Sequence, residues 1–261
     1  MPTGMDTLSA DAVAQGLNTQ VVGRNVLYYP SLTSTMDIAR QGALAGAAEG
    51  TVVIAGRQTA GRGRLKRAWF APTGNIALSV ILYPRAPDLP SLVMLASLGA
   101  VHAIRAVTGI TGAIKWPNDV LIDGRKVCGI LIETSVQRDT VAYAVIGIGV
   151  NVSLVPADFP EIAATAASLS ALAGEEISRV TLTRELLRQL DRLYVGVRQG
   201  DSVFEEWRAS LVTLGQTVRV KSAEDTRDGL AEAVDRDGTL LLRSPDGKLT
   251  RIFAGDVTLG D

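Results

Sequence analysis

The chain has 261 residues, which at roughly 150 residues per domain predicts one large domain with a small companion. Lysine and arginine total 26 and aspartate and glutamate total 27, so the net charge of −1 argues against a protein that coats nucleic acid through bulk charge. Hydrophobic residues make up 47% of the chain and charged residues 20%, which is typical of a globular protein and excludes a disordered one.

Cysteine and histidine are too scarce for several kinds of site. The single cysteine, Cys128, cannot form an internal disulfide, and one histidine, His102, makes a zinc site or a Ser-His-Asp triad improbable. The N-terminus lacks the basic flank and apolar stretch of a secretory signal, and no apolar run approaches the roughly 18 residues of a membrane span. We therefore expect a cytoplasmic protein with no membrane partner.

The first 212 residues predict helices beside a cluster of strands. Helices are expected over 9–16, 34–46, 92–107, 181–197 and 204–211, and strands over 51–55, 76–83, 120–122, 126–133 and 140–150. Ser34, with Asp37 three residues later, is typical of a helix N-cap. Asp123-Gly124 predicts a tight hairpin, because both turn residues tolerate a positive φ. This order favours an α+β fold over a doubly wound parallel sheet.

The pattern of predicted elements changes after residue 212. Short β segments over 217–221, 229–234, 239–243 and 249–253 alternate with Asp-Gly turns at 237–238 and 246–247. This pattern predicts a small barrel or sheet. The predicted domains are therefore residues 1–212 and residues 213–261.

Residues 57–69, called the basic loop below, contain five positive charges and no acidic residue. Glycines in such a loop let backbone N–H groups approach an anion, and arginines supply forked donors. The alternative is a solvated basic loop. It is not a Walker A loop, because no Gly-Lys-Ser/Thr occurs, and Gly147-x-Gly149 lacks the third glycine of a dinucleotide fingerprint.

Three further segments leave two interpretations open. Asn118 and Asp119 either offer an amide and a carboxylate to a ligand or Mg²⁺, or form a turn with local hydrogen bonds. Lys126 at the start of a strand is either an exposed charge on the edge of a sheet or a charge that points into a pocket. Ser34 and Thr35 are either helix caps or partners for a neutral polar ligand group.

Five segments, in order and spacing, resemble those of biotin protein ligases: Ser34-Thr35, 58–69, 115–119, 126–131 and 147–151. The resemblance covers nearly the whole chain. It implies a domain related to class II aminoacyl-tRNA synthetases and an SH3-like C-terminal barrel. It also implies a ligase that makes biotinyl-5′-AMP from biotin and ATP and passes biotin to a lysine of a biotin carboxyl carrier domain. Mg²⁺ is expected on the ATP phosphates, without a protein metal site.

By position, the resemblance assigns site residues of three kinds. The implied biotin contacts are Ser34, Thr35, Met36, Gln58, Gly61, Arg62, Gly63, Arg64, Lys126 and Gly129. The implied ATP contacts are Arg64, Arg67, Trp69, Asn118, Asp119 and Asn151. The implied catalytic residues are Lys126, Arg62 and Arg64. Met36 stands where the family commonly has Asn, and Lys66 where it has Gly, which bears on affinity and on ordering of the loop.

Two other functions compete with this one. A lipoate-type ligase uses a similar fold, but its usual Arg-Gly-Gly-Gly loop is absent from this chain. A nucleic-acid or nucleotide-binding regulator would use the basic loop and barrel, but a net charge of −1 weakens this hypothesis. Family members that repress transcription carry a winged helix-turn-helix, for which the chain before Tyr28 offers no room. We therefore expect no nucleic-acid partner, while an exposed sheet edge would permit a homodimer.

Overall fold

The computed structural model describes residues 7–137, 140–222 and 225–259, so part of the N-terminal segment examined for a signal lies outside it. Seven strands form one sheet in the order β1-β2-β3-β7-β6-β5-β4, in which β1 and β2 run parallel and the other neighbours antiparallel. The predicted α+β fold is confirmed. The strands are β1 (Val26–Tyr29), β2 (Val52–Ala55), β3 (Ile76–Leu82), β4 (Ala113–Lys115), β5 (Asp119–Ile122), β6 (Arg125–Gln137) and β7 (Thr140–Val150).

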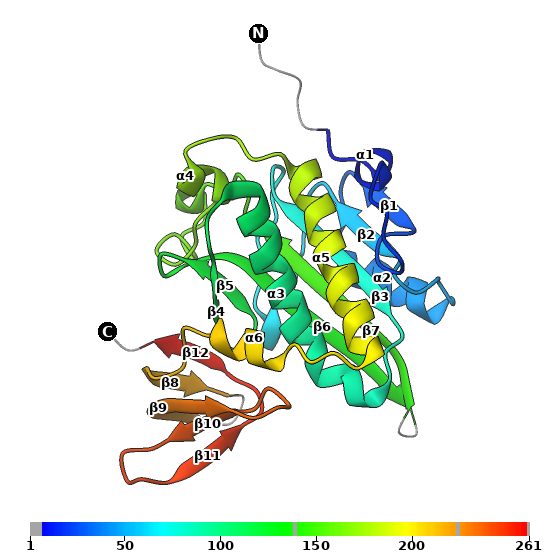
Figure 1. Cartoon of the computed structure of the whole chain (residues 1–261). Helices are drawn as coiled ribbons and strands as arrows, with labels where there is room; N and C mark the ends of the chain where they lie inside the picture. The colour runs from blue at the N-terminus through cyan, green and yellow to red at the C-terminus, as the bar shows by residue number, and fades with distance from the viewer. Residues whose placement is uncertain (1–6, 138–139, 223–224, 260–261) are drawn as a thin grey trace.

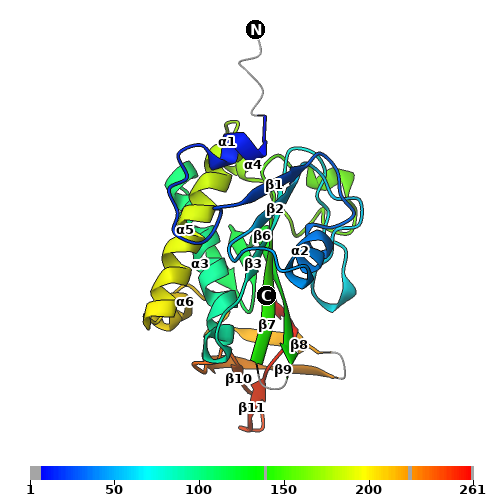
Figure 2. The ribbon, with the colours of Figure 1, turned by 90° about the vertical axis from the view of Figure 1, so that its right-hand side faces the viewer.

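Helices cover both faces of this sheet, with α3 and α5 on one side and α2 on the other (Figures 1 and 2). Because successive side chains on a strand point to opposite faces, Leu78 and Val80 of β3 enter the main core while Ile81 packs in the cluster under α2. The helices are α1 (Ala10–Ala14), α2 (Thr35–Leu44), α3 (Leu89–Thr108), α4 (Leu169–Ala173), α5 (Arg179–Gln199) and α6 (Phe204–Ala209).

The stretch Ala86–Thr108, which includes α3, corrects one expectation. By length and composition it could cross a membrane, because an 18-residue window within it has a mean hydropathy of 1.5. The expectation that no apolar run approaches a membrane span was therefore wrong. In the structure 61% of its apolar 18-residue window is buried, and α3 packs against α5, α6 and the sheet. Its apolar character is accounted for by these contacts on several sides.

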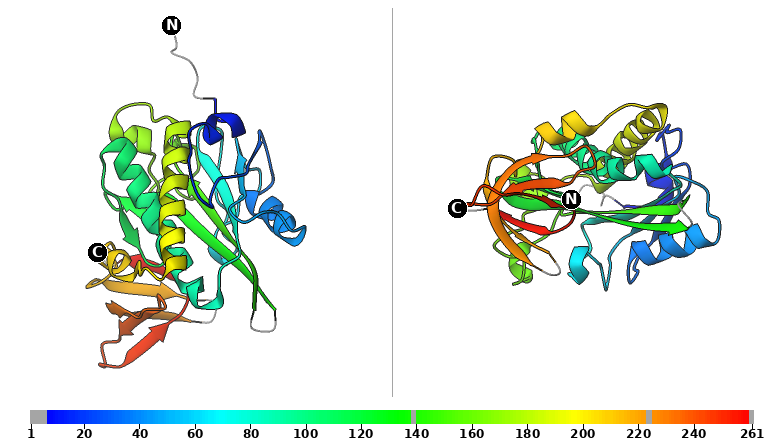
Figure 3. Two further views of the ribbon diagram at one scale, coloured as in Figure 1. Left: turned by 45° about the vertical axis from the view of Figure 1, so that its right-hand side comes forward. Right: turned by 90° about the horizontal axis from the view of Figure 1, so that it is seen from below.

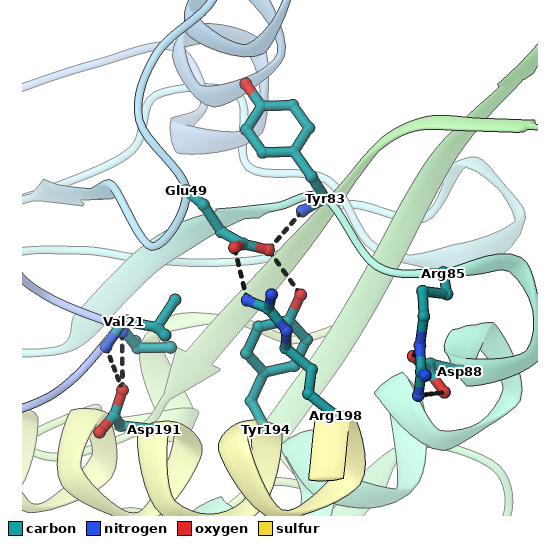
Figure 4. Close-up of polar contacts among 9 residues, drawn as sticks. Val21, Glu49, Tyr83, Arg85, Asp88, Asp191, Tyr194 and Arg198 are labelled. Atoms are coloured by element: carbon teal, nitrogen blue, oxygen red, sulfur yellow. Dashed lines mark hydrogen bonds and ion pairs between the residues drawn. The ribbon is translucent and has the colours of Figure 1, made fainter. Parts of the chain in front are cut away.

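Helix α5 is tied to distant parts of the chain by two carboxylates (Figure 4). Asp191 accepts hydrogen bonds from the backbone N–H groups of residues 20–22, at 2.7 to 2.9 Å. Glu49 accepts one from the Tyr194 hydroxyl at 2.6 Å and one from Arg198 at 2.8 Å. Burial and the Glu49 carboxylate raise the pKa of Tyr194 above its usual value. These contacts fix the segments before β1 and β2 against the helical layer.

A second sheet follows α6 and lies below one end of the first (Figures 1 and 3). Its antiparallel strands, in the order β11-β10-β9-β8-β12, are β8 (Thr217–Lys221), β9 (Thr226–Val234), β10 (Leu240–Arg243), β11 (Leu249–Ile252) and β12 (Asp256–Leu259). Trp116 joins the two sheets, because its backbone N–H donates to Thr213 Oγ1 and its indole N–H to the Gly238 carbonyl, both at 2.8 Å.

Most predicted elements are present within a few residues of their expected ends. The hairpin turn is confirmed, with φ of 50° at Asp123 and 72° at Gly124. Four elements were not predicted, and they are only three to five residues long: β1, β4, β12 and α4. Such short segments carry too few residues for an apolar period to show, and β4 depends on pairing with β5.

Candidate active site

A cavity of about 740 Å³ opens where the basic loop, the start of α2, strands β5 to β7 and strand β12 meet. Of the predicted site residues, all except Gly61 line it: Ser34, Thr35, Met36, Gln58, Arg62, Gly63, Arg64, Arg67, Trp69, Asn118, Asp119, Lys126, Gly129 and Asn151. Gly61 is buried beside the cavity, where a Cβ atom would lie 2.4 Å from the Trp69 carbonyl oxygen. Gly61 therefore contributes to the packing of the basic loop and not to the cavity wall.

Glycines on two paired strands form the floor of the cavity. Gly129 of β6 pairs with Gly149 of β7. The Trp69 indole lies on both, since a Cβ at Gly149 would come within 2.2 Å of it and one at Gly129 within 2.9 Å. A Cβ at Gly147 would lie 2.6 Å from the Met36 sulfur. The missing side chains therefore let two large side chains lie flat against the sheet.

The basic loop folds back on itself as a narrow, irregular hairpin. The Gly63 N–H donates to the Arg67 carbonyl at 2.8 Å, and the Trp69 N–H donates to the Gly61 carbonyl at 2.9 Å. These bonds hold the part of the loop that lines the cavity, including Arg62, Arg64 and Arg67. The predicted effect of Lys66 concerns a side chain outside the described part of the structure.

Lys126 makes the shortest ion pair in the cavity. Its Nζ lies 2.6 Å from Oδ1 of Asp119, while the other carboxylate oxygen lies 3.8 Å from Nζ of Lys115. Lys126 Nζ also lies 5.4 Å from the centre of the Trp69 ring, within range of a cation–π interaction. Strand pairing sets this arrangement, because β5 and β6 are neighbours. The charge of Lys126 therefore faces the cavity.

The arginines of the basic loop take counter-ions from other elements. Arg62 lies 2.9 Å from Asp37 of α2 and 3.4 Å from Glu133 of β6, while Arg67 lies 2.7 Å from Asp256 of β12. These pairs are half-exposed, so each contributes little stability. Cations held this loosely can exchange a protein carboxylate for the anion of a ligand.

Arg64 is the most buried cation of the loop that lines the cavity. Burial lowers its pKa from the usual arginine value, and the nearby carboxylates of Asp119 and Asp256 oppose that shift. Its guanidinium donates to Asn118 Oδ1 at 3.0 Å, and the Asn118 amide donates to the Ile130 carbonyl. A guanidinium that has already lost much of its water can bind an anion with little further desolvation.

Ser34, Thr35 and Gln58 form a polar but uncharged part of the cavity wall, called the polar end below. Ser34 stands at the N-cap position of α2, yet its hydroxyl does not cap the helix, so the predicted capping bond is absent. The Ser34 hydroxyl is buried and has no hydrogen-bond partner among the described residues. Gln58 Oε1 accepts the Thr35 N–H at 2.7 Å. A buried hydroxyl without a partner is costly, which favours a polar ligand group here.

Asn151 and two distant segments complete the wall. Asn151 is buried, and its amide donates to the Lys126 carbonyl at 3.2 Å. Two parts of the cavity wall were not predicted: one is formed by Glu161, Ile162, Thr165 and Ala166, and the other by the part of β12 around Asp256. Nothing in the local sequence of these segments indicates a site, because only the pairing of Lys126 with Ala166 and the docking of the second sheet bring them there.

Among the described residues no cluster of His, Cys, Asp or Glu suits a metal ion.

Comparison with known proteins identifies the family of this chain. Residues 28–151 match the model of the biotin/lipoate A/B protein ligase family, and residues 213–260 match the biotin protein ligase C terminal domain. The chain is 38% identical over 259 residues to the bifunctional ligase/repressor BirA of Bacillus subtilis (strain 168), covering 97% of this chain and 79% of that protein. It is 32% identical to the biotin--[acetyl-CoA-carboxylase] ligase of Paracoccus denitrificans, covering 80% of this chain and 90% of that one.

A solved structure shares the fold. The biotin protein ligase from Aquifex aeolicus in complex with biotin and ATP aligns with a TM-score of 0.76 and 25% identity, over 91% of this chain and 99% of that one. The fold, the cavity and these relatives agree, and the chain belongs to the biotin protein ligase family.

Proposed function

We propose that this chain joins the carboxylate of biotin to the α-phosphate of ATP and then transfers the biotinyl group to a lysine of a biotin carboxyl carrier protein. In the first step the carboxylate oxygen attacks the α-phosphorus, and pyrophosphate leaves with Mg²⁺, which enters bound to ATP. In the second step the carrier amine attacks the acyl carbon, and AMP leaves. The relatives named as biotin ligases and the biotin- and ATP-bound structure support this proposal.

One observation carries the proposal. The cations Lys126, Arg62 and Arg64 line the same cavity as the uncharged polar groups of Ser34 and Thr35. A carboxylate and a phosphate repel each other, and the transition state adds charge to the phosphoryl oxygens, so clustered cations are what the first step needs. The polar end suits the neutral ureido ring of biotin.

The residues take the following roles in this proposal. Lys126 bridges the biotin carboxylate and the α-phosphate, and Arg62 and Arg64 neutralise the remaining charge. The biotin contacts come from Ser34, Thr35, Met36, Gln58, Gly61, Gly63 and Gly129, and the ATP contacts from Arg67, Trp69, Asn118, Asp119 and Asn151. The basic loop covers the reactive mixed anhydride and keeps water from it.

The organisation of the chain completes the proposal. We place the boundary between the catalytic and C-terminal domains after residue 212, where the second sheet is about to begin. Between residues 7 and 25 the structure describes one helix, α1, and irregular segments, which supports ligation without operator binding by the described residues.

The test is incubation with ATP, Mg²⁺ and either biotin or lipoate, followed by mass analysis of a carrier domain. The proposal expects modification that requires biotin and is absent with lipoate. If lipoate but not biotin modifies the carrier, the chain is a lipoate-type ligase. If neither acid modifies the carrier, the proposed ligase function is wrong.

A further inference from the structure

A buried serine lies beneath the polar end of the cavity, without lining it. Ser79 of β3 is fully buried, and its neighbours across the sheet are Val53 and Gly147. Alternation along β3 puts Ser79 on the face that α2 covers. A hydroxyl at such a position requires a partner, and the Ser79 hydroxyl has one, Thr35 Oγ1, at 2.8 Å.

The contacts of Thr35 continue this link to the cavity. Thr35 Oγ1 lies 3.1 Å from Gln58 Oε1, which also accepts the backbone N–H of Thr35 at 2.7 Å. A backbone N–H can only donate, so the Gln58 atom that faces Thr35 is the carbonyl oxygen. The Thr35 hydroxyl must then give its own proton to Gln58, and it can accept only the proton of Ser79. The Thr35 backbone N–H, which can only donate, therefore fixes the direction of all three hydrogen bonds.

The ordered chain fixes which end of the Gln58 amide faces the ligand. With Oε1 held by Thr35, the Nε2 group at the other end of the amide lies next to Gly61, and it has no protein acceptor among the described residues. Gln58 lines the cavity and is half-exposed, so its amide N–H groups are available to an acceptor on a ligand.

We propose that Ser79 is a positioning residue for biotin, acting through Thr35 to hold the Gln58 amide with its N–H groups toward the cavity. This inference rests on the proposed function. Without the Ser79 donor, the Thr35 backbone N–H still selects Gln58 Oε1, but the Thr35 hydroxyl is free to turn its proton away, so the Gln58 amide loses one of its two bonds to Thr35 and is held less firmly. The acceptor recognised in this way is a carbonyl, such as that of the ureido group.

The test compares Ser79→Ala with the unmodified chain, using biotin binding by calorimetry and the rates of biotin-dependent pyrophosphate exchange. The Kd and KM for biotin should rise about 5- to 30-fold, the range expected when a buried hydroxyl loses its hydrogen bond. The KM for ATP and kcat should stay the same, because the phosphate contacts do not involve Ser79. Ser97→Ala is the matched control, since Ser97 is fully buried in α3 and bonds only to carbonyls of its own helix.

A double-mutant cycle separates positioning from a general loss of packing. In a Thr35→Val background, where the chain is already broken, Ser79→Ala should cause no further loss of biotin affinity. Equal losses in both backgrounds, an unchanged biotin Kd in Ser79→Ala, or a parallel rise in the KM for ATP would overturn the inference while leaving the ligase function intact. An unmodified chain that binds no biotin would instead overturn the proposed function, and this inference with it.

Discussion

Lys126 Nζ lies 2.6 Å from Asp119 Oδ1, on neighbouring strands, so the cation with the central proposed role is held by a largely buried carboxylate. Asp119→Asn removes the charge but keeps the shape, and leaves Lys126 and Lys115 without their shared counter-ion. We expect the free energy of unfolding to fall by about 1 to 2 kcal/mol. This is less than the usual cost of breaking a fully buried ion pair, because both lysines are partly exposed. Urea unfolding measures this change.

Asp228→Asn is the matched control for that variant. Asp228 pairs with Arg219 on the exposed surface of the second sheet, where solvent screens the charges, and its loss should leave the unfolding curve unchanged. Equal effects of the two substitutions would show that burial does not govern the Lys126 pair.

The basic loop should resist trypsin when ligand is bound. The Arg67 side chain is 59% exposed and held by Asp256. If the loop closes over the adenylate, biotin with ATP should slow cleavage after Arg64 and Arg67, as mass spectrometry of the fragments would show. The exposed Arg236 gives a reference bond on the second sheet, where cleavage should not change. Equal cleavage of the loop with and without ligand contradicts closure.

Asp256 should restrain the loop before ligand arrives. Asp256 of β12 is the counter-ion of Arg67 in the basic loop, and the Asp256→Asn substitution removes its charge. Trypsin should therefore cut after Arg67 faster in the ligand-free chain. Biotin with ATP should restore protection, because phosphates would then neutralise Arg67. If the variant is cut at the same rate as the unmodified chain, the ion pair does not hold the loop.

How far the sequence predicts this molecule depends on how local each feature is. The hairpin at Asp123 and the long strand over 140–150 follow from turn chemistry and apolar patterning, and both were predicted. Lys126, Asn118 and Ser34 were identified as candidates, but the residues alone left a structural alternative at each. Asp256 and Ser79 could not be predicted, because their contacts arise only when the second sheet docks and when α2 packs on β3.

The Asp191 carboxylate should contribute measurably to the stability of the helical layer. It accepts three backbone N–H bonds from residues 20–22, and Asp191→Asn would turn a charged acceptor into a neutral one with a single oxygen. We expect the free energy of unfolding to fall by about 2 to 3 kcal/mol. Thermal unfolding checks this value, and an unchanged Tm would show that the N-terminal segment docks without Asp191.

Cys128 should be unreactive in the native chain. Burial raises the pKa of its thiol to about 12, so the reactive thiolate is scarce at pH 8. Ellman's reagent should label Cys128 in urea but leave the native chain unlabelled over the same period. Rapid labelling of the native chain would mean that strands β5 and β6 open at this point.

The central claim is that Lys126 lets two like-charged reactants meet. The most direct test is biotin-dependent pyrophosphate exchange by Lys126→Ala, with ATP and Mg²⁺ at saturating concentrations. Loss of one preorganised cation predicts a rate about 100- to 1,000-fold below that of the unmodified chain. Lys248→Ala, which removes an exposed lysine between β10 and β11 that does not line the cavity, should exchange normally. A Lys126→Ala rate close to that of the unmodified chain would contradict the account.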